Sequence, residues 1–329
     1  MTVLSNKKGI SLAIAVWLAN DDYDYNPGII SVTTLMRSVR QIILAKRSGG
    51  GIREDDDLEN YIQSCMGTAI HDSIERVWSD PERVKKSLTK LGYDADHIDR
   101  VRINPPEYSM DTFDVMVENR IYKEFEGVTI SGKYDLILNG QLNDHKSTMT
   151  FMFMNQKNAP KFILQGSLYR WIRPDQITQS TIQINYFFTD WSKIEAMSKP
   201  AYPQMRTVSK QYDLLSYDET EAYVKNKLDL LQLHEDTPEV DLPYCSDEDL
   251  WREEDSFKYY ADETKMHVKG SRSSKNFTTI AEAHKYRAEK GKGAVKVVKG
   301  RVKACNYCSA QNNCSQRNAL VASGSLDAK

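Results

Sequence analysis

The sequence lacks a membrane-spanning apolar run, an even number of cysteines and an overall basic charge. It has no apolar run long enough to cross a bilayer, so a helical membrane protein is excluded. It has five cysteines in 329 residues, an odd number that does not suit a disulfide framework. Its net charge of -2 and pI near 6.3 give no overall basic character. We therefore expect a soluble, cytoplasmic globular protein without a membrane partner.

The N-terminal segment resembles part of a secretory signal. Lys7 and Lys8 precede the apolar residues 10–19, as in the charged and apolar regions of a signal peptide. No small-x-small cleavage site precedes Asp21 and Asp22. The segment is therefore predicted to be a packed helix or strand of the mature protein.

Apolar periodicity, and the residues that interrupt it, indicate the regular elements. The sequence predicts helices at residues 31–48, 58–78, 159–172 and 217–233. It predicts strands at residues 115–125, 128–138, 142–146, 181–188 and 207–215. A helix, three antiparallel strands, a second helix and a further strand imply the α/β class, with a mixed central sheet flanked by helices.

The composition changes after residue 240 and predicts a boundary there. Residues 1–240 are expected to form a core with an N-terminal helical part, residues 241–321 a basic, cysteine-containing segment packed on it, and residues 322–329 a loose tail. From Lys265 to Lys303 there are twelve Lys or Arg and two Glu, a local excess of ten. Such a segment binds a phosphate backbone or is a solvated face, and charge alone favours neither.

One predicted hairpin carries the residues with the clearest chemistry. Asn139 and Gly140 offer the turn of a two-residue hairpin, so Asp135 before it and Asp144 and Lys146 after it are brought to neighbouring strand ends. Carboxylate oxygens suit Mg²⁺ or Mn²⁺, and a lysine beside an activated water suits hydrolysis of a phosphodiester. The stretch therefore predicts a nuclease centre.

Two helical motifs flank this hairpin. Gly67-x3-His71 places a small residue one turn before a histidine, so the backbone can approach another element while His71 projects from one face. Gln165-x3-Tyr169 places two polar side chains four residues apart on the helix after the hairpin.

Together with Gly132-x2-Asp135 and Asp144-x-Lys146, these motifs resemble the PD-(D/E)XK nuclease superfamily in order and in element, and more narrowly its RecB-like exonuclease branch. The resemblance implies a restriction-endonuclease-like α-βββ-α-β core. Two positions depart from the family pattern: Tyr134 stands in place of the nominal proline, and the last triplet begins with aspartate where the branch commonly has glutamate.

The resemblance also implies a role for each polar residue. Asp135 and Asp144 would hold one or two Mg²⁺ or Mn²⁺ ions, with His71 and the backbone carbonyl of His145 completing the ligand shell. Lys146 would orient the attacking water and offset charge in the transition state.

The glutamine and tyrosine of the second helical motif, Gln165 and Tyr169, would support the catalytic site and touch the substrate. Each residue also has a plainer explanation. Asp144 could cap a turn, Lys146 could end a strand in solvent, and Gln165 with Tyr169 could be a helix surface pair. The joint pattern favours the nuclease site over these separate explanations.

Three cysteines follow the spacing Cys305-x2-Cys308-x5-Cys314. The AddB-type and CRISPR-associated RecB-like nucleases hold a [4Fe–4S] cluster with this spacing and one distant upstream cysteine, and the resemblance therefore implies such a cluster. Four thiolates would equally bind Zn²⁺, so the order of expectation is iron–sulfur, then zinc, then no metal. The implied role is to pin the C-terminal segment onto the core.

The fourth ligand is not obvious, because no cysteine stands near residues 31–40, where the family has it. The candidates are Cys245 and Cys65. We favour Cys245, since Cys65 lies six residues before His71 and would draw the cluster toward the active metals.

The resemblance implies a metal-dependent DNA exonuclease for end processing, recombination or replication, with Lys265, Lys269, Arg272 and Lys275 along DNA that has free ends or single-stranded character. The alternatives are a structure-specific endonuclease and a catalytically inactive DNA-binding accessory protein. A bacteriophage origin, and hence a location in the bacterial host cytoplasm, is suggested by resemblance alone. A homo-oligomer or a replication or recombination partner is compatible with the sequence, which does not choose between them.

Overall fold

The computed structural model describes residues 4–20, 26, 28–48, 57–107, 109, 111–268 and 270–327. The chain divides into two compact units. Unit 1 consists of Met1–Met36 and Ile52–Asp229, and unit 2 consists of Arg37–Gly51 and Leu230–Lys329. Among the described residues, no helix has both the length and the apolar character that crossing a membrane requires.

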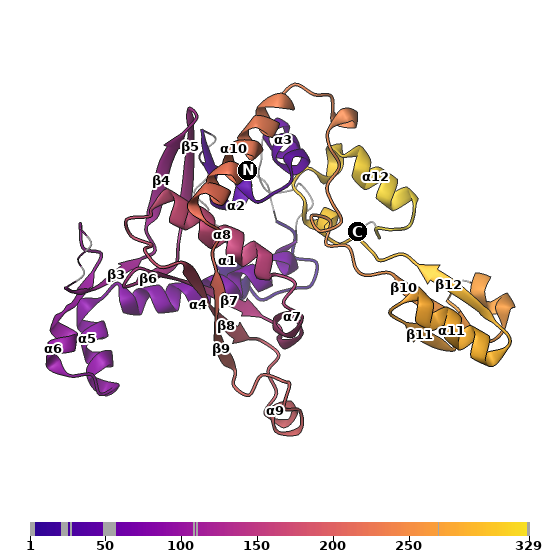
Figure 1. Cartoon of the computed structure of the whole chain (residues 1–329), viewed down its shortest axis with the longest axis horizontal. Helices are drawn as coiled ribbons and strands as arrows, with labels where there is room; N and C mark the ends of the chain where they lie inside the picture. Colours follow the sequence, from indigo (N-terminus) through magenta and orange to yellow (C-terminus); the bar gives the residue numbers. More distant parts are fainter. Residues whose placement is uncertain are drawn as a thin grey trace. The chain divides into compact units, whose positions relative to one another are not determined.

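A six-stranded sheet forms the centre of unit 1 (Figure 1). Its strands are β2 Val101–Ile103, β3 Phe113–Val117, β6 Leu136–Leu138, β7 Gln141–Thr148, β8 Thr181–Phe188 and β9 Thr207–Asp213, in the order β2-β3-β6-β7-β8-β9. The pairs β2/β3 and β7/β8 are parallel, and the other pairs are antiparallel. The predicted mixed sheet is therefore confirmed.

Helices cover both faces of this sheet. They are α4 Ile62–Trp78 and α8 Ala159–Ile172. Successive side chains of a strand point to opposite faces. Ser147 of β7 faces α4, because a Cβ on Gly67 would lie 3.3 Å from its Oγ, whereas the Nζ of Lys146 lies 5.7 Å from the centre of the Phe162 ring on α8. The predicted α/β class with flanking helices is confirmed.

The main apolar core of unit 1 joins the central sheet to α8. Every second residue of β8 is buried, and Ile182 and Ile184 are completely so. Leu168 and Trp171 of α8 belong to the same cluster and are at most 1% exposed. The alternation along β8 therefore reflects one face packed against a helix.

A second sheet in unit 1 changes the predicted strand pattern. It consists of β1 Ile29–Ser31, β5 Val128–Lys133 and β4 Arg120–Phe125, in that order. The single strands predicted at 115–125 and 128–138 are wrong, because each is divided between the two sheets. The chain leaves the central sheet at Glu118, which has a φ of 43°, and returns at Asp135, whose carbonyl accepts a hydrogen bond from the Glu118 N–H at 2.9 Å.

The helix ends were predicted with mixed success. The helices at 159–172 and 217–233 are confirmed as α8 and α10 Tyr217–Leu233, and the helix at 58–78 is α4 preceded by the 3-10 turn η1 Leu58–Tyr61. The single helix predicted at 31–48 is wrong: it is divided into α2 Val32–Leu35 and α3 Val39–Arg47. Ser38 is extended and caps α3, its Oγ accepting a hydrogen bond from the Gln41 N–H at 3.2 Å.

The other helices of unit 1 are α1 Leu12–Ala19, α5 Pro81–Lys90, α6 Ala95–Asp99, α7 Thr150–Asn155 and α9 Lys193–Ser198. The N-terminal apolar segment was predicted to be a helix or a strand, and it forms the helix α1. Most of its apolar side chains are exposed. Leu18 is buried, whereas Leu12 is 79% and Val16 63% exposed.

Unit 2 combines α3 with the C-terminal part of the chain. It contains β10 Ser256–Tyr260, β11 Lys275–Phe277, β12 Ala294–Val298, α11 Ile280–Lys290, α12 Ser315–Ala322 and the 3-10 turns η2 Glu239–Asp241, η3 Glu263–His267, η4 Ala304–Tyr307 and η5 Gln311–Asn313. The strands form an antiparallel sheet in the order β11-β10-β12. Tyr286 of α11 packs against Tyr259 and Phe277, with ring centres 5.1 and 5.2 Å away.

The predicted loose tail is partly packed. Leu326 is 2% exposed and belongs to an apolar cluster with Leu250 and Val302. The carbonyl of Ser325 accepts a hydrogen bond from the Val302 N–H at 2.8 Å. Residues 322–327 therefore continue the fold of unit 2.

Candidate functional site

Asp135 lies where the chain re-enters the central sheet, immediately before β6. Its Oδ2 accepts a hydrogen bond from the backbone N–H of His145 at 2.8 Å and lies 3.3 Å from Nδ1 of His71 on α4. The ring centres of His71 and His145 are 5.8 Å apart. Three residues predicted to hold a metal therefore meet at one place.

Asp144 and Lys146 lie on β7, two residues apart and thus on the same face of the sheet. Asp144 is 4% exposed. Lys146 Nζ donates a hydrogen bond to Asp144 Oδ1 at 3.0 Å and lies 2.7 Å from Oδ2. The contact between Nζ and Oδ2 does not have the geometry of a hydrogen bond. Among the described residues, Asp144 Oδ2 is therefore buried without a hydrogen-bond partner.

The environment shifts the pKa values of the two carboxylates in opposite directions. Burial raises the pKa of Asp144, and the charge of Lys146 offsets this only in part. Burial also raises the pKa of Asp135, but the hydrogen bond and charge of His71, with the His145 N–H, outweigh it and lower the pKa overall. Carboxylates whose pKa values are separated in this way are typical of functional sites.

The cationic groups respond to the same neighbours. Burial lowers the pKa of Lys146, but the charge of Asp144 outweighs it, so the pKa is raised and the amine stays protonated at neutral pH. Burial lowers the pKa of His71, yet the hydrogen bond and charge of Asp135 raise it overall. Burial lowers the pKa of His145.

Gln165 and Tyr169 form a connected pair on α8. The Tyr169 hydroxyl donates to the Lys133 carbonyl at 2.9 Å and accepts from Gln165 Nε2 at 3.1 Å. The ring passes closely over β5, since a Cβ on Gly132 would lie 2.6 Å from Tyr169 Cε1. A side chain at this position would therefore displace the ring, and the tyrosine supports the strand that leads to Asp135. Contact with a substrate stays a prediction.

A small cavity opens beside Asp135, with a volume of about 10 Å³, which is room for about one water-sized atom. His71, Asp135 and His145 line it, and so do Glu75 and Glu118, which the sequence analysis did not single out. Glu75 follows His71 by four residues on α4, and that spacing was a usable signal. Glu118 reaches the site only through the crossing between the two sheets, for which the sequence gave no signal.

The donor set fits a hard divalent cation in its chemistry. The carboxylates of Asp135 and Asp144 provide oxygen ligands. Two buried atoms of the site, Asp144 Oδ2 and His145 Nε2, have no hydrogen-bond partner among the described residues. In the described part of the chain, no group of three or more His, Cys, Asp or Glu side chains already stands in a closed metal-binding arrangement. The predicted ligand set therefore remains a prediction.

Four cysteines of unit 2 gather around one cavity. Cys245, Cys305, Cys308 and Cys314 all line it. Burial raises the pKa of Cys305 to about 11 and also raises that of Cys245. Cys65 lies in unit 1 and is not among the lining residues. The choice of Cys245 over Cys65 as a ligand and the bound metal both stay predictions.

A buried arginine, Arg40 of α3, adjoins this cavity and is 1% exposed. Its Nε donates to Cys314 Sγ at 3.3 Å and its Nη1 to the Leu242 carbonyl at 2.9 Å. Its Nη2 pairs with the Glu239 carboxylate and donates to Ser315 Oγ at 2.9 Å. Arg40 therefore ties α3 to the C-terminal segment around the cysteines.

The residues predicted to contact DNA lie in unit 2. Lys265 is in η3, Arg272 is in the loop before β11, and Lys275 is on β11. Lys275 Nζ lies 4.5 Å from the centre of the Tyr286 ring. Lys269 falls outside the described residues. Contact of these residues with DNA remains a prediction.

Comparison with known proteins gives distant structural likenesses. No protein-family model matches the chain, and no curated protein matches it. The protein in the crystal structure of SSO0001 is 13% identical with a TM-score of 0.37, over 66% of this chain and 81% of that one. An alkaline exonuclease from Laribacter hongkongensis is 10% identical with a TM-score of 0.35, over 63% and 90%. A phage-related exonuclease from Haemophilus somnus 129PT is 14% identical with a TM-score of 0.32, over 72% and 94%. These likenesses are too distant to support a function, which we base on the site itself.

Proposed function

We propose that the chain is a metal-dependent deoxyribonuclease that acts as an exonuclease. The observation that carries the proposal is the meeting of Asp135, His71 and His145 beside the buried Asp144–Lys146 pair on β7. Two acids with opposite pKa shifts and a protonated lysine are the groups that hydrolysis of a phosphodiester needs.

Asp135 and Asp144, with His71 and the backbone carbonyl of His145, would hold Mg²⁺ or Mn²⁺. The metal would supply Lewis-acid charge for the phosphoryl oxygens. Lys146 would orient the attacking water and offset negative charge that develops on the phosphate, because its pairing with Asp144 keeps it protonated.

Gln165 and Tyr169 would fix the backbone before Asp135 and contact the substrate from α8. Tyr169 is 4% exposed and its hydroxyl is held by Lys133, so it acts as a rigid support. The more exposed Gln165 is the better placed of the two to reach a phosphate or nucleotide.

DNA is the proposed substrate, with free ends or single-stranded character. The charge of unit 2 supports this, since Ser256 to Lys299 contains eleven Lys or Arg and four Asp or Glu, an excess of seven. Lys265, Lys269, Arg272 and Lys275 would follow the backbone, and affinity would fall with salt. A role in recombination, replication or end processing, and the RecB-like relationship, belong to the same proposal.

The four cysteines would bind a [4Fe–4S] cluster or, as the alternative, Zn²⁺. Burial raises the pKa of Cys245 and Cys305, and thiols with a raised pKa need a cation to become thiolates, which supports a metal here. The bound group would staple the C-terminal segment of unit 2 to α3. Iron and sulfide in anaerobically purified protein would support the cluster. Stoichiometric zinc without iron would instead support the zinc alternative.

A substrate panel tests the exonuclease. Wild-type protein is given linear and closed circular DNA, single- and double-stranded, with Mg²⁺ or Mn²⁺. We expect degradation of linear DNA only, and none by Asp135→Ala, which should still bind DNA. Cleavage of closed circles would replace the proposal with a structure-specific endonuclease. DNA binding without cleavage under all conditions would indicate an inactive accessory protein.

A further inference from the structure

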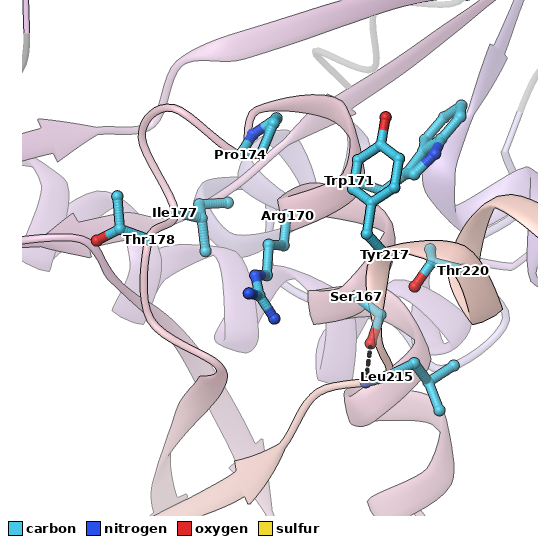
Figure 2. Close-up of a pocket in the computed structure, with 9 residues that line it drawn as sticks. All are labelled: Ser167, Arg170, Trp171, Pro174, Ile177, Thr178, Leu215, Tyr217 and Thr220. Carbon is cyan, nitrogen blue, oxygen red and sulfur yellow. Dashed lines mark hydrogen bonds between the residues drawn. The ribbon is translucent and has the colours of Figure 1, made fainter.

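A second cavity of unit 1 lies apart from the proposed catalytic residues (Figure 2). Its volume is about 260 Å³, and it is formed by the end of α8, the turn before β8 and the start of α10. The lining residues are Ser167, Arg170, Trp171, Pro174, Ile177, Thr178, Leu215, Tyr217 and Thr220. None of them is acidic, and none also lines the cavity beside Asp135.

Arg170 is the charged residue of this cavity. Figure 2 shows its guanidinium extending between Ile177 and Ser167, away from Pro174. Within the described residues it has neither a hydrogen bond nor an ion pair. Arg173, three residues later, makes the usual two-pronged pair with Asp175, at 2.9 and 2.6 Å. The cavity thus holds a half-buried guanidinium that the protein itself leaves uncompensated.

The surroundings of the cavity add a second positive charge, that of Lys123. Lys123 Nζ donates to the Trp171 carbonyl at 3.0 Å, lies 4.0 Å from the centre of the Trp171 ring, and bonds the Tyr217 hydroxyl. Glu221 of α10 accepts a hydrogen bond from Trp171 Nε1 at 3.0 Å. An anion in the cavity would therefore meet the Arg170 guanidinium, with the Lys123 ammonium against the Trp171 and Tyr217 rings that line it.

The walls limit what such an anion can be. Ile177 is completely buried and Trp171 is 1% exposed, so the floor is apolar and closed. The hydroxyls of Ser167 and Thr220 donate to the carbonyls of Ile163 and Ser216, at 2.7 Å each. Arg170 is therefore the main donor available, and its fork suits the paired oxygens of a phosphate.

We propose that this cavity is a phosphate-binding site in which Arg170 holds the phosphate of a nucleotide with two hydrogen bonds. The volume accommodates a phosphate with an attached sugar and is below the usual range for larger organic ligands. The phosphate comes from a free mononucleotide or from a DNA strand. Because the site shares no lining residue with the cavity beside Asp135, it does not depend on the proposed nuclease activity.

Binding is measured by calorimetry on the full-length protein without added divalent metal, with inorganic phosphate, dAMP and a single-stranded oligonucleotide as probes. Charge-assisted bidentate bonds of this kind predict that Arg170→Ala weakens binding on the order of ten- to a hundredfold, with Arg170→Lys intermediate. Arg173→Ala is the matched control, because its guanidinium is paired with Asp175, and it should bind like wild type.

The two sources give different results. An effect of Arg170→Ala on dAMP identifies a free nucleotide, and an effect on the oligonucleotide alone identifies a DNA strand. The proposal is overturned if wild type shows no saturable binding of any probe, or if Arg170→Ala, with an unchanged melting temperature, binds all three like wild type. Asp144→Asn should leave binding of dAMP unchanged, which separates this site from the nuclease.

Discussion

The two units hold their reactive groups in opposite ways. In unit 1 the charged groups of the candidate site are paired by the protein itself: Asp135 with His71, and Asp144 with Lys146. In unit 2 the four cysteines line one cavity, and burial raises the pKa of Cys305 to about 11.

This difference predicts different responses to loss of metal. The pairs in unit 1 compensate their own charges, so the strands and helices that carry them should keep their structure without a bound ion. In unit 2 burial raises the pKa of Cys245 and Cys305, and a metal that bound them as thiolates would be part of the fold. A chelator should therefore loosen unit 2 while leaving unit 1 folded.

The largest expected effect concerns Lys146 in unit 1. Lys146→Ala should lower the rate of DNA cleavage on the order of a thousandfold, because the charge beside the phosphate is lost, and DNA affinity should change little. Lys199→Ala is the control, since Lys199 pairs with Glu195 on the exposed surface of α9. Single-turnover cleavage of labelled DNA gives the rates, and equal rates for the two variants would remove Lys146 from the mechanism.

The next effect concerns Arg40 in unit 2. Arg40→Ala removes the guanidinium from the Glu239 carboxylate, which keeps its bonds from Ser315, and from Cys314, and should cost about 3 kcal/mol in the stability of unit 2. Arg47→Ala, at the exposed end of the same helix, should cost less than about 1 kcal/mol. Hydrogen exchange resolved by segment should show faster exchange in α3 and α12 and no change in β7 and β8. Uniform acceleration in both units would contradict the separate roles.

A smaller effect is expected for Gly132, where β5 meets the Tyr169 ring. Gly132→Ala should destabilise unit 1 by about 2 kcal/mol, because the new Cβ must displace the ring. Gly28→Ala is the control, since its Cβ would meet only ordinary contact with Asn26. Urea unfolding gives the two values. A stability equal to that of the control would show that the tyrosine is not held against β5.

The smallest effect concerns a buried carboxylate of unit 1 whose charge is balanced by an arginine and not by a metal. Asp114 is 1% exposed and binds Arg102 at 2.8 and 2.7 Å. Burial raises its pKa, but Arg102 and Thr112 outweigh this and lower it overall. The pair therefore stabilises the fold above the ordinary aspartate pKa of about 3.9, and this contribution is lost as the pH falls through the lower folded value.

Asp114→Asn should therefore cost about 1.5 kcal/mol at pH 7 and progressively less below pH 4. Melting temperatures of the variant and wild type at pH 7 and pH 3 measure this difference. A gap that stays constant across this range would show that the charge of Asp114 is not what makes the pair stabilising.

The sequence predicted those parts of unit 1 that local patterns determine. The ends of α8 and α10 follow from Pro174 and from apolar periodicity, and the turn at Asn139 joins β6 and β7 as expected. The division of two strands between sheets was missed, because it depends on how Glu118 and Asp135 pair across the fold. Periodicity contains no information about which sheet a strand joins.

The sequence also predicted which acids, histidines and cysteines lie near one another, through the family motifs. It did not predict that α3 belongs to unit 2. The partners of Arg40 lie about 200 residues later in the chain, at Glu239 and Leu242, and no local pattern connects them. Arg170 was missed for a similar reason, since its cavity is closed by α10.

The most direct test of the nuclease site uses Asp144→Asn, which keeps the shape of the side chain and removes its charge. Wild type and variant are incubated with end-labelled linear DNA in Mn²⁺, and release of the label is followed at equal DNA occupancy. We expect the variant to release the label on the order of a thousand times more slowly. Release at the wild-type rate would contradict the assignment of the site.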